Sequence, residues 1–355
     1  MSWFRPNIER MQGYTPGEQP QVKGFIKLNT NESPYPPSPR VLKALRATAD
    51  KAVRLYPDPM ANAVRRAAAE VFGVPVSRIL AGNGSDDLLT MILRAAVGPG
   101  RTVAYPVPTY TLYRTLAQIG NSRTREVPFP ADFHLPPGLF RKGDAATIIA
   151  NPNSPTGTAV SNAELSRLAR AVSGLLIVDE AYVDFADRHA LLLVERHPNV
   201  VVLRTFSKSF SLCGVRLGLA FAREDVIEGL AKVKDSYNVN RFAIAAGVAA
   251  LEDIAWMHAN ADRIRATRDR LSRTLASAGW RVLPSQSNFV FARVPATAPF
   301  TAGDMYRALK DRKILVRYFD VPGLNDGLRI TVGNDREIDA LLRNIRDIAA
   351  TAAAR

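Results

Sequence analysis

The chain has 355 residues, of which 47% are hydrophobic and 23% charged, a composition that suits a large globular domain plus a smaller one. No N-terminal apolar run resembles a signal peptide, and no stretch approaches the length of a membrane span. A single cysteine, Cys213, excludes an intrachain disulfide and a cysteine metal cluster, and the four scattered histidines lack ligand spacing. We therefore expect a cytoplasmic protein without a metal site or a membrane partner.

The net charge of +14 has two interpretations. A basic surface can bind nucleic acid, or the positive charge can serve an anionic cofactor and substrate. Arginines and lysines are spread along the chain without a run of five or six, which favours small anionic ligands.

Residues 1–35 are rich in Pro, Gly, Asn and Tyr, and predict an extended arm. Beyond about residue 40, segments with helical spacing of apolar residues (VLKALRATADKAV, MANAVRRAAAEVFG) precede and alternate with short aliphatic runs. The runs RIL, TVAYP, ATIIAN, GLLIVDEAY and VVLRTFS are typical of buried strands in a parallel sheet. This alternation predicts an open α/β sheet in a large domain over residues 36–245.

The last third of the chain predicts a smaller α+β domain over residues 246–355. One or two long helices over 243–278 are followed by strands in WRVLPSQSNFVFARV, a helix in AGDMYRALKDRK, and strands in ILVRYF and GLRITV. A final helix follows, and Asn334 and Glu337 have the spacing of a capping box at its start.

Lys208 follows one predicted strand, within the segment VVLRTFSKSFSLCGVRLG. A lysine held at the carboxyl end of a strand can form an imine with an aldehyde. Ser207 precedes it and Arg216 follows, and a hydroxyl with a guanidinium suits a phosphate. Taken alone, Lys208 is more simply a surface lysine in a polar loop.

Asp179 ends the aliphatic run LLIV of a second strand. An unpaired carboxylate is costly to bury there, and a protonated pyridine nitrogen is a suitable partner. Tyr182 can donate to the phenolate oxygen of the same ring. Taken alone, Asp179 is equally well an N-cap residue.

Two further strands end in turn residues. In NPNSPTG, Asn153 offers an amide donor to a ring oxygen. In GNGSDDLL, Gly84 lets the backbone approach an anion, and Ser85 begins a helix whose first amides suit a phosphate. We expect the carboxylates that follow, including Asp86, to face away or to cap the helix. An ordinary loop and a serine N-cap are the simpler interpretations of each segment alone.

One ligand uses all four strand ends, because pyridoxal 5′-phosphate (PLP) carries an aldehyde, a pyridine nitrogen, a phenolate oxygen and a phosphate. At these residues the sequence resembles the class I/II, fold-type I PLP-dependent aminotransferases, and within them most resembles the histidinol-phosphate aminotransferases. The resemblance covers nearly the whole chain, with the segments GYTPGEQ, LNTNESPYPPSP, LYPDP, GNGSDDLL, PTYTLYR, NPNSPTG, VDEAYVDF, RTFSKSFSLCGVRLG and LRITVG in the expected order.

The resemblance implies an α/β fold-type I architecture, with a mostly parallel central sheet flanked by helices and a smaller α+β C-terminal domain. It implies that Lys208, Asp179 and Tyr182 are catalytic. For cofactor binding it implies Tyr56, Gly84, Ser85, Asp86, Tyr110, Asn153, Asp179, Tyr182, Ser207, Lys208 and Arg216. For substrate binding it implies Tyr14, Asn31, Tyr237, Arg317 and Arg329.

Two of these assignments carry further consequences. Tyr56 would reach the cofactor phosphate of a neighbouring subunit, so the resemblance implies a homodimer with shared active sites. Many family members have Asn directly before Pro-Thr-Gly, where this chain has Ser154. We assign the ring contact to Asn153, with Ser154 as the alternative.

The resemblance implies transfer of an amino group from histidinol phosphate to 2-oxoglutarate, giving imidazole acetol phosphate and glutamate in histidine biosynthesis (EC 2.6.1.9). Aromatic amino-acid aminotransferases share every cofactor residue, and phosphothreonine-type decarboxylases use a similar scaffold, so both stay open as alternatives. A PLP-binding regulator that contacts DNA would need a helix-turn-helix domain, for which the roughly 35 residues before the resemblance are too short. We therefore expect an enzyme with small-molecule partners and no nucleic-acid partner.

Overall fold

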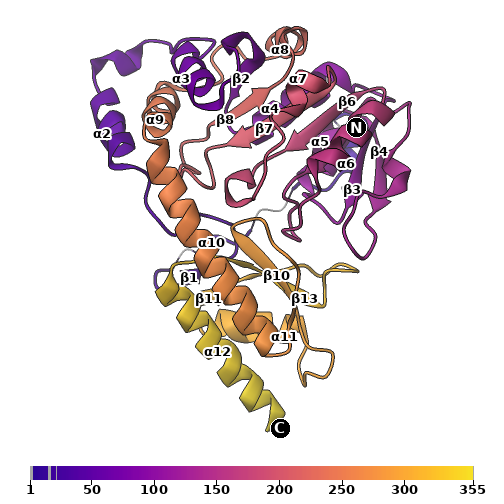
Figure 1. Cartoon of the computed structure of the whole chain (residues 1–355), viewed down its shortest axis with the longest axis vertical. Coiled ribbons are helices and arrows are strands. Elements are labelled where there is room, and N and C mark those ends of the chain that lie inside the picture. The colour runs from indigo at the N-terminus through magenta and orange to yellow at the C-terminus, as the bar shows by residue number, and fades with distance from the viewer. Residues whose placement is uncertain (1–2, 15–16, 21, 355) are drawn as a thin grey trace.

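In the computed structural model, which describes residues 3–14, 17–20 and 22–354, a seven-stranded sheet lies between two layers of helices (Figure 1). Its strand order is β2-β8-β7-β6-β5-β3-β4. The strands are β2 (Ile79–Gly82), β3 (Thr102–Val107), β4 (Arg123–Pro128), β5 (Ala146–Ala150), β6 (Leu175–Asp179), β7 (Val200–Thr205) and β8 (Gly218–Phe221). Neighbouring strands are parallel except at β8, which is antiparallel to β2 and β7. The predicted, mostly parallel sheet is confirmed.

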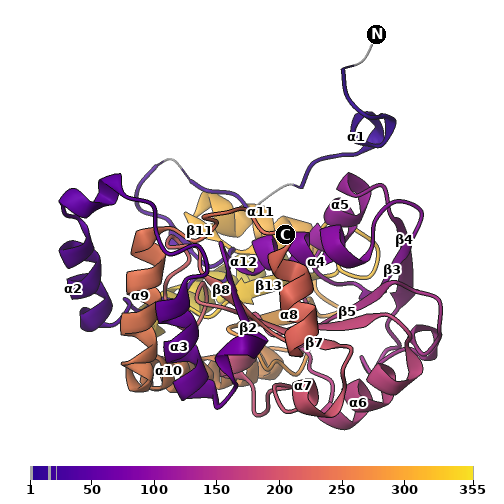
Figure 2. The same cartoon turned by 90° about the horizontal axis from the view of Figure 1, so that it is seen from above.

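The central strands are mostly aliphatic because helices cover both faces of the sheet. In β6, Leu176 and Val178 pack into one core, whereas Ile177 packs into the other. Figure 2 shows the two layers of helices from above. The first core includes residues of α3 (Asn62–Phe72), α6 (Asn162–Ala171) and α9 (Arg241–Leu251). The second core includes residues of α4 (Ser85–Ala96), α5 (Leu112–Ile119) and α8 (Glu224–Ala231).

A second, antiparallel sheet of four strands lies at the far end of the long helix α10 (Ile254–Ser277), as Figure 1 shows. Its order is β12-β13-β10-β9, formed by β9 (Arg281–Val282), β10 (Phe289–Arg293), β12 (Arg317–Tyr318) and β13 (Gly327–Thr331). Helices α11 (Ala302–Asp311) and α12 (Asp335–Ala353) share a core with it. The capping box of Asn334 and Glu337 at the start of α12 is confirmed.

The N-terminal arm joins both parts of the molecule. Its strand β1 (Ile26–Lys27) pairs in parallel with β11 (Ile314–Leu315) of the C-terminal part. Its helix α1 (Pro6–Arg10) lies beside α5, where Asn7 Nδ2 donates to the Gln118 carbonyl at 2.8 Å. The remaining elements are α2 (Pro39–Thr48), η1 (Lys51–Arg54), η2 (Val76–Arg78), η3 (Pro137–Leu139), η4 (Val183–Phe185) and α7 (Leu193–Arg196). The domain limits at residues 35 and 245 stay a prediction.

Sequence patterns did not indicate every element. Strand β4 has the sequence RTREVP, and its polar residues lie at the sheet edge, where a strand needs no continuous apolar run. The helix predicted in VLKALRATADKAV ends at Thr48, because the Asp50 side chain caps the new turn η1. Among the described residues, no single helix is long and apolar enough to span a membrane, and only the strongly bent pair α9–α10 passes that test jointly.

Candidate active site

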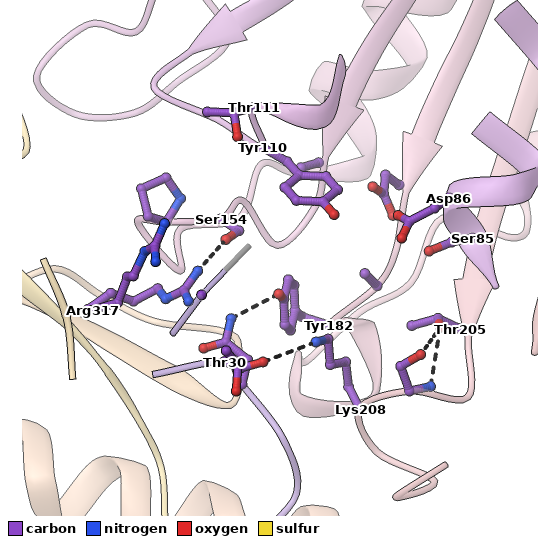
Figure 3. Close-up of a pocket in the computed structure, with 18 of the residues that line it drawn as sticks. Thr30, Ser85, Asp86, Tyr110, Thr111, Ser154, Tyr182, Thr205, Lys208 and Arg317 are labelled. Atoms are coloured by element: carbon purple, nitrogen blue, oxygen red, sulfur yellow. Dashed lines mark hydrogen bonds between the residues drawn. The ribbon is translucent and has the colours of Figure 1, made fainter. Parts of the chain in front are cut away.

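A cavity of about 390 Å³ opens at the carboxyl ends of β5, β6 and β7, the edge at which open α/β sheets bind ligands. Figure 3 shows side chains from both parts of the molecule converging on it. The predicted site residues that line it are Tyr14, Asn31, Ser85, Asp86, Tyr110, Asp179, Tyr182, Ser207, Lys208, Arg216, Arg317 and Arg329. Predicted site residues from segments far apart in the chain therefore lie around one cavity.

Lys208 belongs to the loop after β7, and its side chain extends toward the N-terminal arm. Its Nζ atom is 3.5 Å from the Thr30 carbonyl oxygen and 5.7 Å from the centroid of the Tyr182 ring (Figure 3). The loop is fixed on the other side of the lysine, where Ser209 Oγ donates to the carboxylate of Asp184. The amine is thus held inside the cavity rather than in solvent.

A buried ion pair supports this loop and the turn after β6. Arg204 Nε lies 3.2 Å from Glu180 Oε2, and Arg204 Nη1 lies 3.4 Å from Asp184 Oδ1. Burial raises the pKa of Glu180 to about 7, although the Arg204 charge opposes the shift. Because Asp184 also accepts from Ser209, the pair links the turn that carries Tyr182 to the loop that carries Lys208.

Asp179 presents one free carboxylate oxygen. Its Oδ2 atom accepts a hydrogen bond from Tyr113 Oη at 2.7 Å, whereas its buried Oδ1 atom has no hydrogen-bond partner among the described residues. Burial raises the pKa of Asp179 to about 6, against the lowering effect of the Tyr113 hydrogen bond. A buried, half-satisfied carboxylate requires a cationic donor, and the protonated nitrogen of a pyridine ring fits this requirement.

The start of α4 forms an anion-binding cradle at one end of the cavity. Gly84 is the N-cap residue with φ of 90°, and no side chain caps this helix start. A Cβ at Gly84 would lie 2.7 Å from Arg216 Nη2, and one at Gly218 would lie 2.6 Å from the Ser85 amide nitrogen. Gly84 therefore leaves room for the guanidinium beside the uncapped helix amides, and Gly218 lets β8 pack against the start of α4. This arrangement suits a phosphate.

Arg216 completes this cradle. Its Nη1 atom donates to Ser207 Oγ at 3.3 Å, and its Nη2 atom lies 3.5 Å from Asp86 Oδ2. We expected the Asp86 side chain to face away from the site or to cap the helix, but it lines the cavity and pairs with Arg216. The expectation was wrong because it neglected the guanidinium, which compensates a carboxylate beside the anion site.

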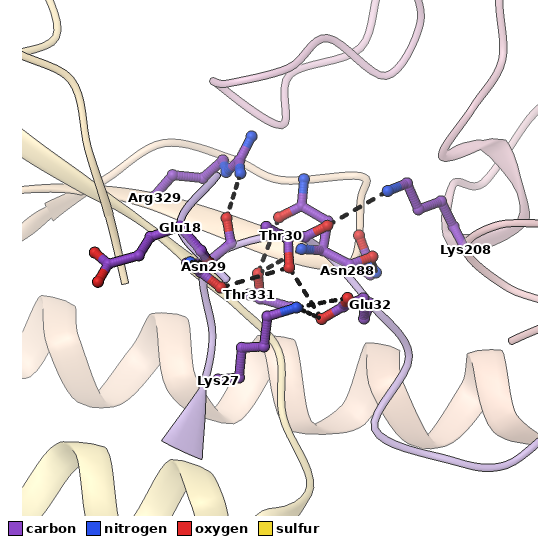
Figure 4. A network of polar contacts seen from close by, with 10 residues as sticks. Glu18, Lys27, Asn29, Thr30, Glu32, Lys208, Asn288, Arg329 and Thr331 are labelled. Carbon is purple, nitrogen blue, oxygen red and sulfur yellow. Dashed lines mark hydrogen bonds and ion pairs between the residues drawn. The ribbon is translucent and has the colours of Figure 1, made fainter. Parts of the chain in front are cut away.

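Two arginines mark another part of the cavity. Arg329 donates from Nη2 to the Asn29 carbonyl at 2.7 Å (Figure 4). It also donates from Nη1 to Ser154 Oγ at 3.2 Å. Its buried Nε atom has no partner within the described part of the chain, and burial lowers its pKa. The Arg317 guanidinium lies 5.4 Å from the Phe319 ring. A second anion is therefore expected here, separate from the cradle at α4.

The structure separates the two candidates for the ring-oxygen contact. Asn153 does not line the cavity: its Nδ2 atom donates to the Pro108 carbonyl at 3.0 Å and to Thr156 Oγ1 at 2.8 Å. Its Oδ1 atom accepts from Thr109 Oγ1 at 2.7 Å. Ser154 lines the cavity instead. Asn153 thus stabilises the turn, and the geometry favours Ser154 for the contact.

Tyr56 and Tyr237 lie outside the cavity of their own chain. Tyr56 is 78% exposed, and its ring stacks on that of Tyr237 with 4.3 Å between centroids. Tyr237 is not among the residues that line the cavity of its own chain, and its role in substrate binding stays a prediction. The lining residues that sequence analysis missed include Thr30, Tyr113, Thr205 and Phe319. Of these, Tyr113 had a usable signal, because it follows Tyr110 by three residues at the start of a helix.

Comparison with known proteins agrees with this geometry. The family model for class I and II aminotransferases matches residues 23–345. The chain belongs to this family. It is 44% identical over 349 residues to "Histidinol-phosphate aminotransferase 1" of Trichormus variabilis, covering 98% of this chain and 99% of that one. It is also 44% identical over 342 residues to "Histidinol-phosphate aminotransferase" of Rhodopirellula baltica, covering 96% and 94% of the two chains.

A solved structure gives the same result for the fold. The crystal structure of histidinol-phosphate aminotransferase from Sinorhizobium meliloti in complex with pyridoxal-5′-phosphate superposes with a TM-score of 0.89 at 27% identity, covering 99% of this chain and 98% of that one. The predicted fold class and family are confirmed.

Proposed function

We propose that this chain is a PLP-dependent aminotransferase that transfers the amino group of histidinol phosphate to 2-oxoglutarate. The observation that carries the proposal is one cavity with a lysine amine, a half-satisfied buried carboxylate and two separate anion sites. The identity of 44% over nearly the full chain to proteins of that name supports this substrate over an aromatic amino acid.

The cavity residues divide into those that hold the cofactor and those that move a proton. The α4 amides, Ser207 and Arg216 would hold its phosphate, and Asp179 would keep its ring nitrogen protonated. Bound PLP supplies an aldehyde that captures the substrate amine and a ring that accepts electrons from the reacting carbon. Lys208 Nζ would accept the proton released from the α-carbon of the substrate. It would then deliver that proton to the exocyclic carbon of the cofactor.

The second anion site accounts for two different substrates. Arg329 and Arg317 can bind the phosphate of histidinol phosphate in one half-reaction and a carboxylate of 2-oxoglutarate in the other. Ser154 Oγ accepts from Arg329 Nη1 and so fixes the orientation of its guanidinium.

We also propose a homodimer that works in the cytoplasm. Val53, Leu55 and Tyr56 are exposed large apolar residues in and just after η1, and Tyr237 is exposed beside them. A second copy of the chain would cover this surface and bring Tyr56 to the cofactor phosphate of its partner.

The half-reactions test the substrate proposal. The PLP-loaded protein is mixed, without a 2-oxo acid, with histidinol phosphate, phenylalanine or phosphothreonine, and the cofactor absorbance and the released products are followed. Rapid conversion of the cofactor to its amine form by histidinol phosphate alone is the expected result. Equal conversion by phenylalanine would favour an aromatic aminotransferase, and release of carbon dioxide from phosphothreonine would favour a decarboxylase.

A further inference from the structure

Tyr113 is a fully buried tyrosine directly behind the cavity. It lies in the first turn of α5, and its side chain packs in the second core of the sheet with Ile148 and Ile177. It also reaches the cavity wall. A phenol at this depth is retained only where its hydroxyl has a partner, because an unpaired buried hydroxyl is costly.

The partner of that hydroxyl is the carboxylate of Asp179. Tyr113 Oη donates to Asp179 Oδ2 at 2.7 Å, and Oδ1 is the oxygen left without a partner within the described chain. The hydrogen bond therefore assigns different tasks to the two oxygens. One is held by the protein core, and the other is free for a donor from the cavity.

The Tyr113 ring also fixes the side chain next to it. It meets the Tyr110 ring edge to face, with 5.7 Å between centroids and an angle of 84°. Its other neighbour is Tyr105, at 5.9 Å and 62°. Because edge-to-face contacts favour one relative orientation, Tyr113 connects the acid of the site to the aromatic ring expected on the cofactor face.

We propose that Tyr113 is a positioning residue, which holds Asp179 through Oδ2 so that Oδ1 receives the ring nitrogen of the cofactor, and which orients Tyr110. The proposal rests on the proposed PLP-dependent function. It adds a residue that acts through two others, Asp179 and Tyr110.

Because of the charges around Asp179, loss of the Tyr113 hydroxyl should have an effect that depends on pH. Burial and the nearby Asp86 carboxylate raise the pKa of Asp179, whereas the Tyr113 hydroxyl, the Ala181 amide and the Lys208 charge lower it. Loss of the hydroxyl removes one lowering contribution, so the carboxylate form of Asp179 requires a higher pH. A variant without the hydroxyl should therefore be impaired most in acid, where the carboxylate becomes protonated.

Tyr113→Phe tests the proposal, with Tyr105→Phe as the matched control. Tyr105 is also buried and donates to a carboxylate, Glu126 Oε1 at 2.8 Å, but it does not line the cavity. The dissociation constant of PLP from each apoprotein is measured by absorbance titration at about pH 6 and about pH 8. We expect Tyr113→Phe to weaken binding by about tenfold, the effect of one hydrogen bond to a charged group, and more at the lower pH. Tyr105→Phe should match the parent protein at both.

A double-mutant cycle separates positioning from general damage to the core. In the Asp179→Asn background, which removes the carboxylate, Tyr113→Phe should lose most of its effect on PLP binding. An equal effect of Tyr113→Phe at both pH values, or full additivity with Asp179→Asn, overturns the proposal while PLP binding by the parent protein keeps the proposed function. Failure of the parent protein to bind PLP overturns the function itself.

Discussion

Asn31 donates from Nδ2 to Tyr182 Oη at 2.9 Å and thereby connects the N-terminal arm to the turn after β6. The same asparagine accepts from Thr331 Oγ1 at 2.9 Å and donates from its backbone nitrogen to that oxygen at 3.0 Å. Asn288 donates to its carbonyl at 2.9 Å. Because Tyr182 Oη accepts the Asn31 proton, its own hydrogen stays available for a cofactor oxygen.

Asn31→Asp should reverse this hydrogen bond. The new carboxylate accepts the Tyr182 hydrogen, so we expect kcat/KM to fall by about tenfold, the effect of one lost hydrogen bond to a charged group. Aspartate tolerates the left-handed φ of 58° at this position, so the backbone should not be strained further.

Tyr182→Phe provides the benchmark for Asn31→Asp. If Asn31 acts through Tyr182, the double variant should be no slower than the slower single variant. Steady-state kinetics of the three proteins decide the question, and additive losses would show that Asn31 acts on the substrate directly.

Asp179 should limit the stability of the apoprotein. Burial raises its pKa from 3.8 to about 6, so the folded chain binds this proton more tightly than the unfolded chain. The associated stability is fully present below about pH 4 and is lost as the pH rises through about 6. Above that pH the unpaired carboxylate costs up to about 3 kcal/mol.

Asp179→Asn removes this cost together with the function. We expect the apoprotein variant to be more stable than the parent by about 1–3 kcal/mol at about pH 8, and closer to it at about pH 5. Its kcat should fall by about a hundredfold or more, since the acid that keeps the ring nitrogen protonated is lost. Urea unfolding of both apoproteins at the two pH values measures the stability difference. A variant less stable than the parent at the higher pH contradicts the argument.

The sequence was sufficient for β2, β3, β5, β6 and β7 of the large sheet and for one end of the cavity, but not for β4 and β8. Aliphatic runs locate β5, β6 and β7, and the polar residues that follow them must meet at one sheet edge. Lys208 and Asp179 were predicted on this basis, whereas Arg216 was predicted as a phosphate ligand close to Lys208 in the sequence.

Contacts between segments far apart in the chain could not be predicted from the sequence. No sequence pattern shows that the Asn153 amide donates to Pro108 and Thr156, or that Asp86 pairs with Arg216. The pairing of β1 with β11 likewise depends on the folded C-terminal part, because a two-residue strand has no periodicity of its own. These features depend on distances between segments, which composition and spacing do not encode.

Arg329→Lys should impair recognition of anions while keeping the charge. Lysine lacks the fork that contacts Asn29 and Ser154 together, so we expect KM for 2-oxoglutarate to rise by about tenfold or more with a smaller change in kcat. Arg293→Lys is the control, because Arg293 pairs with Asp326 outside the cavity. Unchanged KM values for both substrates would place anion recognition elsewhere.

Two inactive variants should restore activity when their subunits mix. Lys208→Ala removes the amine of a chain's own site, whereas Tyr56→Ala is proposed to damage the site of its partner. A mixed dimer then has one site with neither change, so random exchange of equal amounts should return about a quarter of the parent activity. Sedimentation should show a dimer, and the activity should appear at the rate of subunit exchange. If Tyr56 served its own chain, each site of the mixed dimer would carry one of the two changes and the mixture would stay as inactive as its components.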